Sequence, residues 1–187
     1  VANSYEPMIL LPKSDGKMFE LFVSNDKLES EFLTVKMRLI AFTGEEVWNS
    51  ESNLNIGKSS ISKVGEWSLT EMMKNPELRK LSVLKIQLLK QDSLVDEELF
   101  YFEKPKDLLL SNVDPKIEVQ LVGDHIEVEI NSPVLLKDVM ISCDVDAKFS
   151  ENFFDVLPTE TKTVSLYPTR LVIPKIALKS LNQFYPN

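Results

Sequence analysis

The feature that most constrains the fold is the strict alternation of apolar and polar side chains in FLTVKMRLIAF, residues 32–42. Every second position is apolar, at Leu33, Val35, Met37, Leu39 and Ala41. Successive side chains on a strand point to opposite faces, so this pattern predicts a strand with one buried face. The turn signal Thr43-Gly44 and the segment EVWNSESNLNI follow. Together they predict an antiparallel hairpin.

Three further segments of the first hundred residues predict strands: MFELFVS (18–24), SVLKIQLLK (82–90) and LVDEELFYFE (94–103). The intervening SLTEMMKNPELRKL permits one short helix at most, because Ser68 or Thr70 can cap it and Pro76 stops the pattern. About six or seven strands in a segment of this length is typical of an immunoglobulin-like sandwich.

A connector follows in EKPKDLLLSNVDPK, which carries two prolines and several charges. Strand alternation then restarts in KIEVQLV (116–122) and HIEVEI (125–130), so we expect Ile117, Val119, Leu121, Ile126, Val128 and Ile130 to face one core. Strands in DVMISCDV and TKTVSLYP and a segment near IALKSLNQFY complete a smaller sandwich. The predicted fold is all-β, with two tandem immunoglobulin-like β-sandwich domains at 1–104 and 105–187.

The charge of the chain argues against a nucleic-acid partner. It holds 29 acidic and 21 basic residues, for a net charge of −8, and no basic cluster interrupts this excess. No membrane partner is expected either, because every apolar run falls far short of the roughly 20 residues that span a bilayer. The first sixteen residues, VANSYEPMILLPKSDG, have no signal-peptide pattern, and the missing initial methionine predicts an excised piece.

No residue is predicted to be catalytic. Two pairs of acids, Asp144 with Asp146 and Glu151 with Asp155, are spaced so that they could face one sugar in glycosidase chemistry. Acids at strand ends are usually solvated, and nothing apolar is placed to raise the pKa of either pair. The chain also lacks a nucleophile elbow, a glycine-rich phosphate loop and a Ser/His/Asp set.

No metal or cofactor site is predicted, because the single histidine and the single cysteine give no ligand spacing. His125, in a Gly-Asp-His turn, is expected to be exposed. Cys143 lies near Ile141 and Val145 on an apolar strand face, where we expect it to pack as a small hydrophobe.

The aromatic residues allow two interpretations, a sugar-stacking platform or the inside of a sandwich. Trp48 and Trp67 are isolated among core-type neighbours, which favours packing between the sheets. In FSENFFDVLPTETKTVSL (149–166), adjacent phenylalanines on a strand point to opposite faces and cannot form one flat platform. We therefore expect at least one of Phe153 and Phe154 in the core, with Phe149 anchoring the preceding loop.

Several segments together carry a family resemblance: FELFVSNDKLE, GEEVW, WSLTEMM, LFYFEKPKDLLL, SCDVDAKFSENFFDVLPTETKTVSL and LKSLNQFY. The series resembles the two C-terminal β-sandwich domains of β-mannosidases in glycoside hydrolase family two. The family more often has glycine after Pro158, whereas Thr159 here favours a type I turn.

The resemblance implies a modular enzyme that removes terminal β-mannose by a retaining mechanism in an upstream (β/α)₈ barrel. This chain would then be a scaffold that is inactive alone, with the parent's barrel as its partner and mannose-containing glycan reached through the parent. Ser30-Glu31-Phe32 echoes the family's nucleophile motif, but Leu33 replaces its glycine, so no catalytic residue is carried over. The alternative is an independent carbohydrate- or protein-binding module. A bacterial parent would be periplasmic or secreted and a eukaryotic one lysosomal, and the compartment stays open.

Overall fold

In the computed structural model, strand β3 (Glu31–Ala41) contains the alternating segment, and its apolar face is buried. Leu33, Val35, Met37 and Leu39 are at most 1% exposed. Strand β4 (Glu46–Ile56) pairs with β3 in antiparallel register after the Thr43-Gly44 turn. The predicted buried face and the predicted hairpin are therefore both present.

The structure describes residues 7–170 and 172–184, which form two compact units. The N-terminal unit contains residues 7–41 and 45–108, and the C-terminal unit contains residues 109–170 and 172–184 together with 42–44. The first six residues of the chain and Tyr185, which belong to two of the segments interpreted above, lie outside the described residues. The predicted division after residue 104 stays a prediction about folding units.

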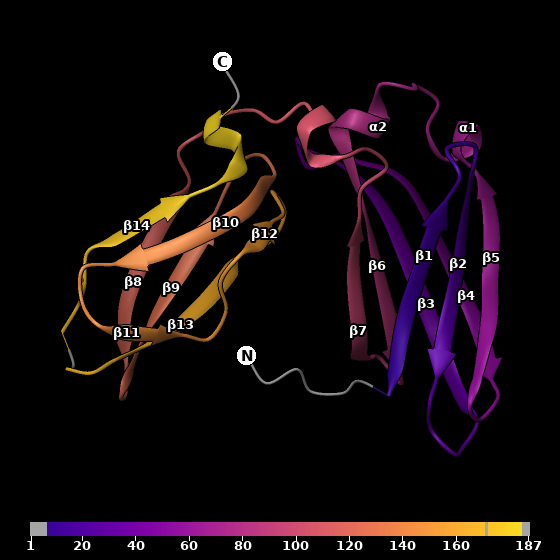
Figure 1. Cartoon of the computed structure of the whole chain (residues 1–187), viewed down its shortest axis with the longest axis horizontal. Helices are drawn as coiled ribbons and strands as arrows, with labels where there is room; N and C mark the ends of the chain where they lie inside the picture. Colours follow the sequence, from indigo (N-terminus) through magenta and orange to yellow (C-terminus); the bar gives the residue numbers. More distant parts are fainter. Residues whose placement is uncertain (1–6, 171, 185–187) are drawn as a thin grey trace. The chain divides into compact units, whose positions relative to one another are not determined.

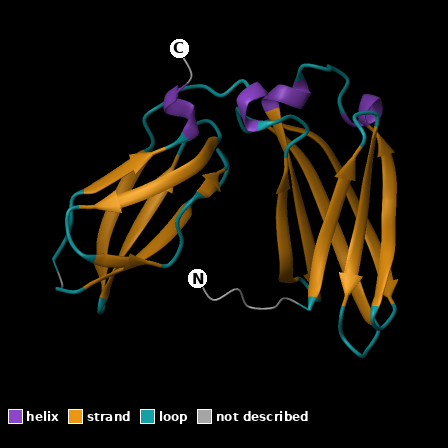
Figure 2. Cartoon of the chain, in the orientation of Figure 1, coloured by secondary structure: helices purple, strands orange, loops and turns teal. Residues whose placement is uncertain are grey.

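The N-terminal unit is an antiparallel sandwich of two sheets (Figures 1 and 2). One sheet has the order β4-β3-β6-β7, with β6 at Ser82–Lys90 and β7 at Ser93–Phe100. The other has the order β1-β2-β5, formed by Met8–Ser14, Met18–Asn25 and Ser60–Ser68. The all-β, immunoglobulin-like class predicted from the sequence is confirmed.

Strands β1 and β5 are not predicted from the sequence, for local reasons. Pro12 interrupts β1, which is tolerated because β1 lies at a sheet edge. The register of β2 with β5 shifts next to Leu21, which breaks the alternation of β5.

The sequence predicts one short helix at most between β5 and β6, but the structure contains two, α1 (Leu69–Met72) and α2 (Leu78–Leu81). The carbonyl and side chain of Asn75 accept bonds from Leu78 N and Glu77 N, which restarts the helix after the proline.

The two tryptophans belong to an aromatic cluster inside the N-terminal sandwich. Phe19 is fully buried, and its ring centroid lies 5.3 Å from that of Phe100 and 6.0 Å from that of Trp67. Trp48 meets Trp67 edge to face at 6.3 Å. A Cβ atom at Gly65 would lie 2.6 Å from Cη2 of Trp67, so this position has room only for glycine. Trp48 and Trp67 are thus packing residues, as the sequence predicts.

The C-terminal unit is a smaller antiparallel sandwich (Figure 1). Its four-stranded sheet has the order β11-β13-β9-β8, formed by Ala147–Phe149, Lys162–Pro168, His125–Asn131 and Lys116–Val122. Its three-stranded sheet has the order β12-β10-β14, formed by Phe154–Val156, Leu136–Cys143 and Ile176–Lys179. The 3₁₀ helices η1 (Pro105–Asp107) and η2 (Leu181–Phe184) lie in the connector and after β14.

The predicted core of this unit is present with one correction. Ile126, Val128 and Ile130 on β9 are fully buried, and Ile117 and Val119 pack against them. Leu121 was expected in the same core, but it is 49% exposed near the end of the edge strand β8. Cys143 packs against the core, and its thiol donates to the Val145 carbonyl at 3.1 Å.

Of the adjacent phenylalanines, Phe154 is the core residue. It is 6% exposed, and Phe149 packs against the same cluster, as expected. Phe153 is 71% exposed and has a positive φ of 62°, so it is not part of the core. The following turn is closed by Glu160 N donating to Leu157 O at 3.1 Å, and Thr159 is not among the described residues with positive φ. This geometry excludes a type II turn and agrees with the preference of threonine for type I.

We expect truncation of the two adjacent rings to have unequal effects on stability. Phe154→Ala leaves a cavity in the core and should lower the free energy of unfolding by about 3–5 kcal/mol, whereas Phe153→Ala should change it by less than about 0.5 kcal/mol. Scanning calorimetry of both variants checks this by following the transition of the C-terminal sandwich. Equal losses would mean that Phe153 also belongs to the core.

Candidate functional site

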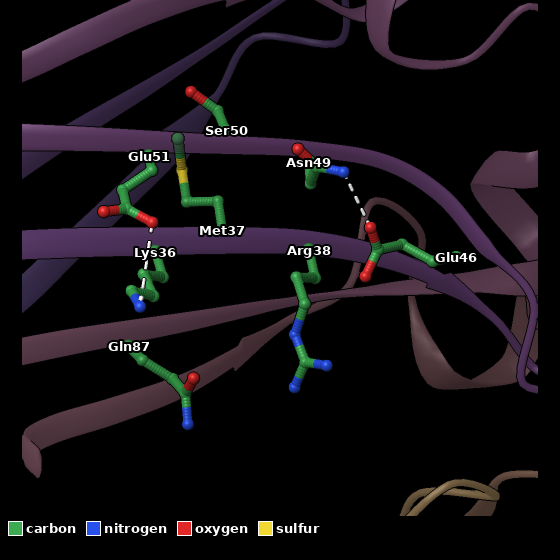
Figure 3. Close-up of a pocket in the computed structure, with 8 residues that line it drawn as sticks. All are labelled: Lys36, Met37, Arg38, Glu46, Asn49, Ser50, Glu51 and Gln87. Atoms are coloured by element: carbon green, nitrogen blue, oxygen red, sulfur yellow. Dashed lines mark hydrogen bonds and ion pairs between the residues drawn. The ribbon is translucent and has the colours of Figure 1, made fainter.

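A polar hollow in the N-terminal unit lies on the outer face of the sheet β4-β3-β6 (Figure 3). It measures about 320 Å³ and is lined by Lys36, Met37, Arg38, Glu46, Asn49, Ser50, Glu51 and Gln87. We call it the polar hollow. The register positions these side chains, because Lys36 is opposite Glu51 on β4 and Gln87 on β6, and Arg38 is opposite Asn49. Sequence reasoning missed this site, since the polar half of an alternating strand is the normal pattern of a solvated face.

The polar hollow offers both hydrogen-bond donors and hydrogen-bond acceptors. Lys36 Nζ lies 3.7 Å from Glu51 Oε2, and Asn49 Nδ2 donates to Glu46 Oε1 at 2.7 Å. The guanidinium of Arg38 and the amide of Gln87 extend on the same side of the sheet (Figure 3). The described residues that line it include no aromatic ring for stacking. Such a set can bind hydroxyl or carboxylate groups. The described lining includes no cysteine and no histidine.

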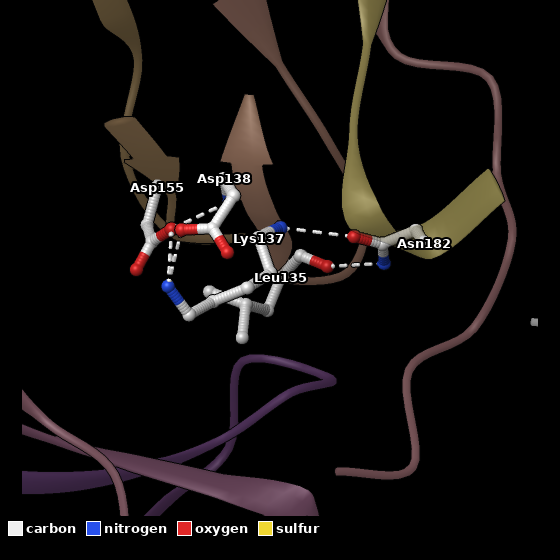
Figure 4. A network of polar contacts seen from close by, with 5 residues as sticks. All are labelled: Leu135, Lys137, Asp138, Asp155 and Asn182. Atoms are coloured by element: carbon white, nitrogen blue, oxygen red, sulfur yellow. Dashed lines mark hydrogen bonds and ion pairs between the residues drawn. The ribbon is translucent and has the colours of Figure 1, made fainter. Parts of the chain in front are cut away.

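A second polar cluster holds the acid Asp155 inside the C-terminal unit (Figure 4). The carboxylate, with 9% of its side chain exposed, lies 3.2 Å from Lys137 Nζ and accepts a 2.8 Å hydrogen bond from Asp138 N. Lys137 Nζ also donates to Asp138 Oδ1 at 2.7 Å. Oδ1 of Asp155 is therefore engaged in holding the bulged start of β10, where the register with β12 shifts.

Lys137 is a cation in this cluster. Burial by itself would lower the pKa of its ammonium, but the carboxylates of Asp138 and Asp155 more than offset that effect, so the pKa of Lys137 is raised. A lysine with a raised pKa keeps its proton at neutral pH. Lys137 is thus unsuited to act as a general base or a nucleophile.

Asn182 fixes helix η2 to the rest of the C-terminal unit (Figure 4). It is fully buried, its Oδ1 accepts from Lys137 N at 2.9 Å, and its Nδ2 donates to the carbonyls of Ser111 and Leu135 at 2.8 Å each. One amide thus joins three segments that lie far apart in the sequence. The position of η2 is set by hydrogen bonds to the backbone.

The remaining acids of the two carboxylate pairs considered in the sequence have separate partners. Asp144 Oδ1 accepts a 2.8 Å hydrogen bond from Lys175 N. Glu151 pairs with Lys162 at 2.5 Å, with half of its side chain exposed. The backbone carbonyl of Asp146 accepts from Thr169 N at 3.0 Å. Each of these contacts stabilises a loop or a strand end.

Glu31, in the Ser-Glu-Phe segment, has a similar structural role. Its side chain is 8% exposed and contacts two ammonium groups, Lys90 at 2.6 Å and Lys27 at 3.0 Å. Hydrogen bonding from Lys90, and then from Lys27, lowers the pKa of Glu31 below its ordinary value. These contacts engage the carboxylate on both sides, which leaves it poorly placed to attack a sugar.

His125 is half-buried, with 22% of its side chain exposed, which corrects the expectation of an exposed side chain. Its ring stacks on Tyr167 at a centroid distance of 5.5 Å. Asp124 and Glu127 lie 3.3 Å and 3.6 Å from its two ring nitrogens.

Within residues 7–170 and 172–184, no group of three or more His, Cys, Asp or Glu residues is arranged to hold a metal ion. No helix in this part of the chain has the length and apolar character needed to cross a bilayer.

Comparison with known domain families found one match in each half of the chain. A family model described as a Mannosidase Ig/CBM-like domain matches residues 17–107, and a mannosidase Ig-fold domain matches residues 112–184. Residues 17–107 thus belong to the first of these domain families and residues 112–184 to the second. A search of curated protein sequences found no match for the chain.

Solved structures support the fold of both mannosidase-type domains. A β-D-mannosidase from Dictyoglomus thermophilum has a TM-score of 0.70 at 17% identity, covering 94% of this chain and 22% of that chain. An exo-chitosanase from Amycolatopsis orientalis has a TM-score of 0.57 at 14% identity, covering 95% of this chain and 26% of that chain. The chain therefore spans about a quarter of the length of the structures that it resembles.

We expect Glu31 to contribute to stability only where it is ionised. Because its folded pKa is lowered, its contribution is present above its ordinary pKa of 4.5 and is lost as the pH falls through the lower folded value. Glu31→Gln should be less stable than the wild type at pH 7, and the difference should shrink towards pH 3. Calorimetry of the N-terminal transition across this range measures it. Glu51→Gln, at a side chain 57% exposed, is the control and should follow the wild-type profile.

Proposed function

We propose that this chain is the non-catalytic C-terminal pair of domains of a family-two β-mannosidase and acts as a scaffold for its catalytic barrel. The observation that carries the proposal is the tandem order of the two domain families along one chain. Similar structures, a β-D-mannosidase and an exo-chitosanase, support an accessory role in a glycosidase. The choice of mannosidase rests on the family descriptions and on the sequence resemblance.

In this proposal the chemistry lies in the parent barrel, where two carboxylates would cleave terminal β-mannose with retention. A retaining pair needs two acids about 5–5.5 Å apart, one of them with its pKa raised. Asp155 is engaged by Lys137 and by the backbone N–H of Asp138, and Glu31 is engaged by two lysines. Asp144 is held by the backbone N–H of Lys175. These contacts support the proposal that none of the three is catalytic. Mannose-containing glycan would reach this chain only through the parent.

A second candidate is a carbohydrate-binding role for the N-terminal domain, favoured by the polar hollow. Its cationic and amide side chains on β3 and β6, Lys36, Arg38 and Gln87, can donate hydrogen bonds to sugar hydroxyls. The absence of a stacking ring among its described lining residues argues for weak affinity, since stacking supplies much of the apolar contact in such sites.

The isolated chain should not hydrolyse an aryl β-mannoside. A colorimetric assay of the purified protein tests this expectation, with the full-length parent polypeptide as the positive control. The parent should release the aryl group, and the chain alone should match the buffer blank. Turnover by the isolated chain that disappears when one of its own acids is replaced would contradict the scaffold proposal.

The carbohydrate-binding candidate predicts that manno-oligosaccharides bind to the isolated chain and that Arg38→Ala weakens this binding at least tenfold. Isothermal titration with mannose and manno-oligosaccharides measures both affinities. Lys63→Ala, on β5 outside the polar hollow, is a matched control that should bind as the wild type does. If the wild type shows no heat of binding at millimolar sugar, the scaffold proposal stands alone.

A further inference from the structure

A second, chemically different hollow lies in the C-terminal unit, beside strands β10 and β14, which are neighbours in Figure 1. It measures about 280 Å³. Its apolar wall is formed by Met140, Phe153, Leu181 and Phe184, and its rim carries Asp138 and Lys179. We call it the apolar hollow.

Two aromatic rings at the apolar hollow are largely exposed. Phe153 is 71% exposed and Phe184 is 79% exposed. Single exposed apolar residues are normal, but two exposed rings that line one hollow with a leucine and a methionine form a contiguous apolar patch. Such a patch is typical of a surface that contacts another molecule.

Backbone strain coincides with the same hollow. Asp138 and Phe153 have φ values of 51° and 62°, in the left-handed region that non-glycine residues seldom adopt. The other described non-glycine residues in this region, Ser59, Gln91 and Asp92, lie in turns between strands. Asp138 instead lies within β10, and Phe153 directly precedes β12. Aspartate tolerates this conformation, but for a bulky side chain such as that of Phe153 it is unfavourable.

Asn152 holds Phe153 in this conformation. Its side chain accepts from Ile141 N and donates to Ile141 O, both at 2.9 Å, and so occupies the pairing position that a strand backbone would take. The same side chain accepts a hydrogen bond from Phe153 N at 3.1 Å. The chain therefore keeps a strained residue with its ring outside the core, although the adjacent Phe154 fills the core. Strain that is maintained at an exposed apolar side chain indicates a binding role.

The side chains that line the apolar hollow favour one kind of binding partner over two others. A sugar carries hydroxyls that need hydrogen-bond partners, but the wall is apolar and the rim carboxylate of Asp138 already accepts from Lys137. A second copy of the chain would bring together two molecules that each carry a net charge of −8. An apolar side chain on a different protein surface fits the wall best. The matched structures contain about three quarters of their length outside the region that this chain covers.

We propose that the apolar hollow docks an apolar side chain from the catalytic part of the parent glycosidase. This inference rests on the proposed scaffold function and names the surface through which the scaffold acts. The ring of Phe153 is held outward to meet that side chain, and Phe184 lines the same hollow.

Hydrogen exchange provides the direct test. The 187-residue chain is compared with the full-length polypeptide encoded by the reading frame that contains it. Backbone amides of residues 152–154 and 181–184 should exchange at least tenfold more slowly in the full-length polypeptide, because docking covers them. Residues 32–34, around Phe32, whose side chain is 67% exposed in the N-terminal unit, serve as the control segment and should show no such change.

The variant Phe153→Asn makes the test specific, because asparagine accepts a positive φ and cannot fill the docking contact. In the isolated chain, this variant should melt at the wild-type temperature or above it. In the full-length polypeptide, it should abolish the tenfold protection and lower the melting temperature. A structural role of the ring alone would instead destabilise both forms to the same degree. Phe32→Ser should leave the protection of residues 152–154 unchanged.

The remaining outcomes overturn the inference in distinguishable ways. A reading frame without a catalytic barrel would remove the proposed function and the docking site together. A barrel with unprotected residues 152–154 would remove the docking site alone. Two results with the isolated chain would assign the hollow to another partner. One is a dimer in sedimentation that dissociates in the Phe153→Asn variant, and the other is manno-oligosaccharide binding that this variant abolishes.

Discussion

The structure depends above all on the burial of alternating side chains between paired sheets. In the N-terminal unit, β3 lies between β4 and β6 in one sheet. The opposite sheet covers the apolar face of β3, and the polar face of β3 points towards solvent. Each fully buried side chain of this size contributes about 1.5–3 kcal/mol, and β3 alone supplies several of them. The aromatic cluster around Phe19 fills the space between the sheets near Trp48 and Trp67. Both tryptophans are thereby partly buried against the core.

In the smaller C-terminal sandwich, buried polar side chains also hold segments of the fold together. The side chains of Asn182 and Asp155 satisfy backbone groups at the bulged start of β10, and Asn182 also fixes the segment that follows β14. Lys137 pairs with the carboxylate of Asp155. Partly buried polar groups cost stability unless they are paired, and the described residues contain no buried side-chain nitrogen or oxygen without a hydrogen-bond partner. Acids that would be catalytic candidates in isolation are thus committed to holding the fold. This commitment is the physical basis for proposing a scaffold.

The outer surface retains two features that the fold itself does not require. The polar hollow lies on the solvated face of β3 and offers hydrogen bonds without a stacking ring. The apolar hollow combines exposed rings with a strained backbone, which a folding requirement alone does not explain. The two hollows differ in chemistry, since one suits hydroxylated ligands and the other suits an apolar protein surface. A scaffold that positions a catalytic barrel would use the second kind.

The sequence by itself determined the all-β class, the β3–β4 hairpin and the burial of β9, because period-two alternation is a local property of the chain. It also indicated that one of two adjacent phenylalanines must be buried, and the family resemblance pointed to mannosidase-type domains. Only the tertiary structure decided that Phe154 is inside and Phe153 outside, because the amide of Asn152 occupies the pairing position opposite Ile141. The exposure of Leu121 and the two lysine partners of Glu31 were likewise undecided by local pattern. Edge position and contacts between distant segments are set by strand order, and strand order is a property of the folded chain as a whole.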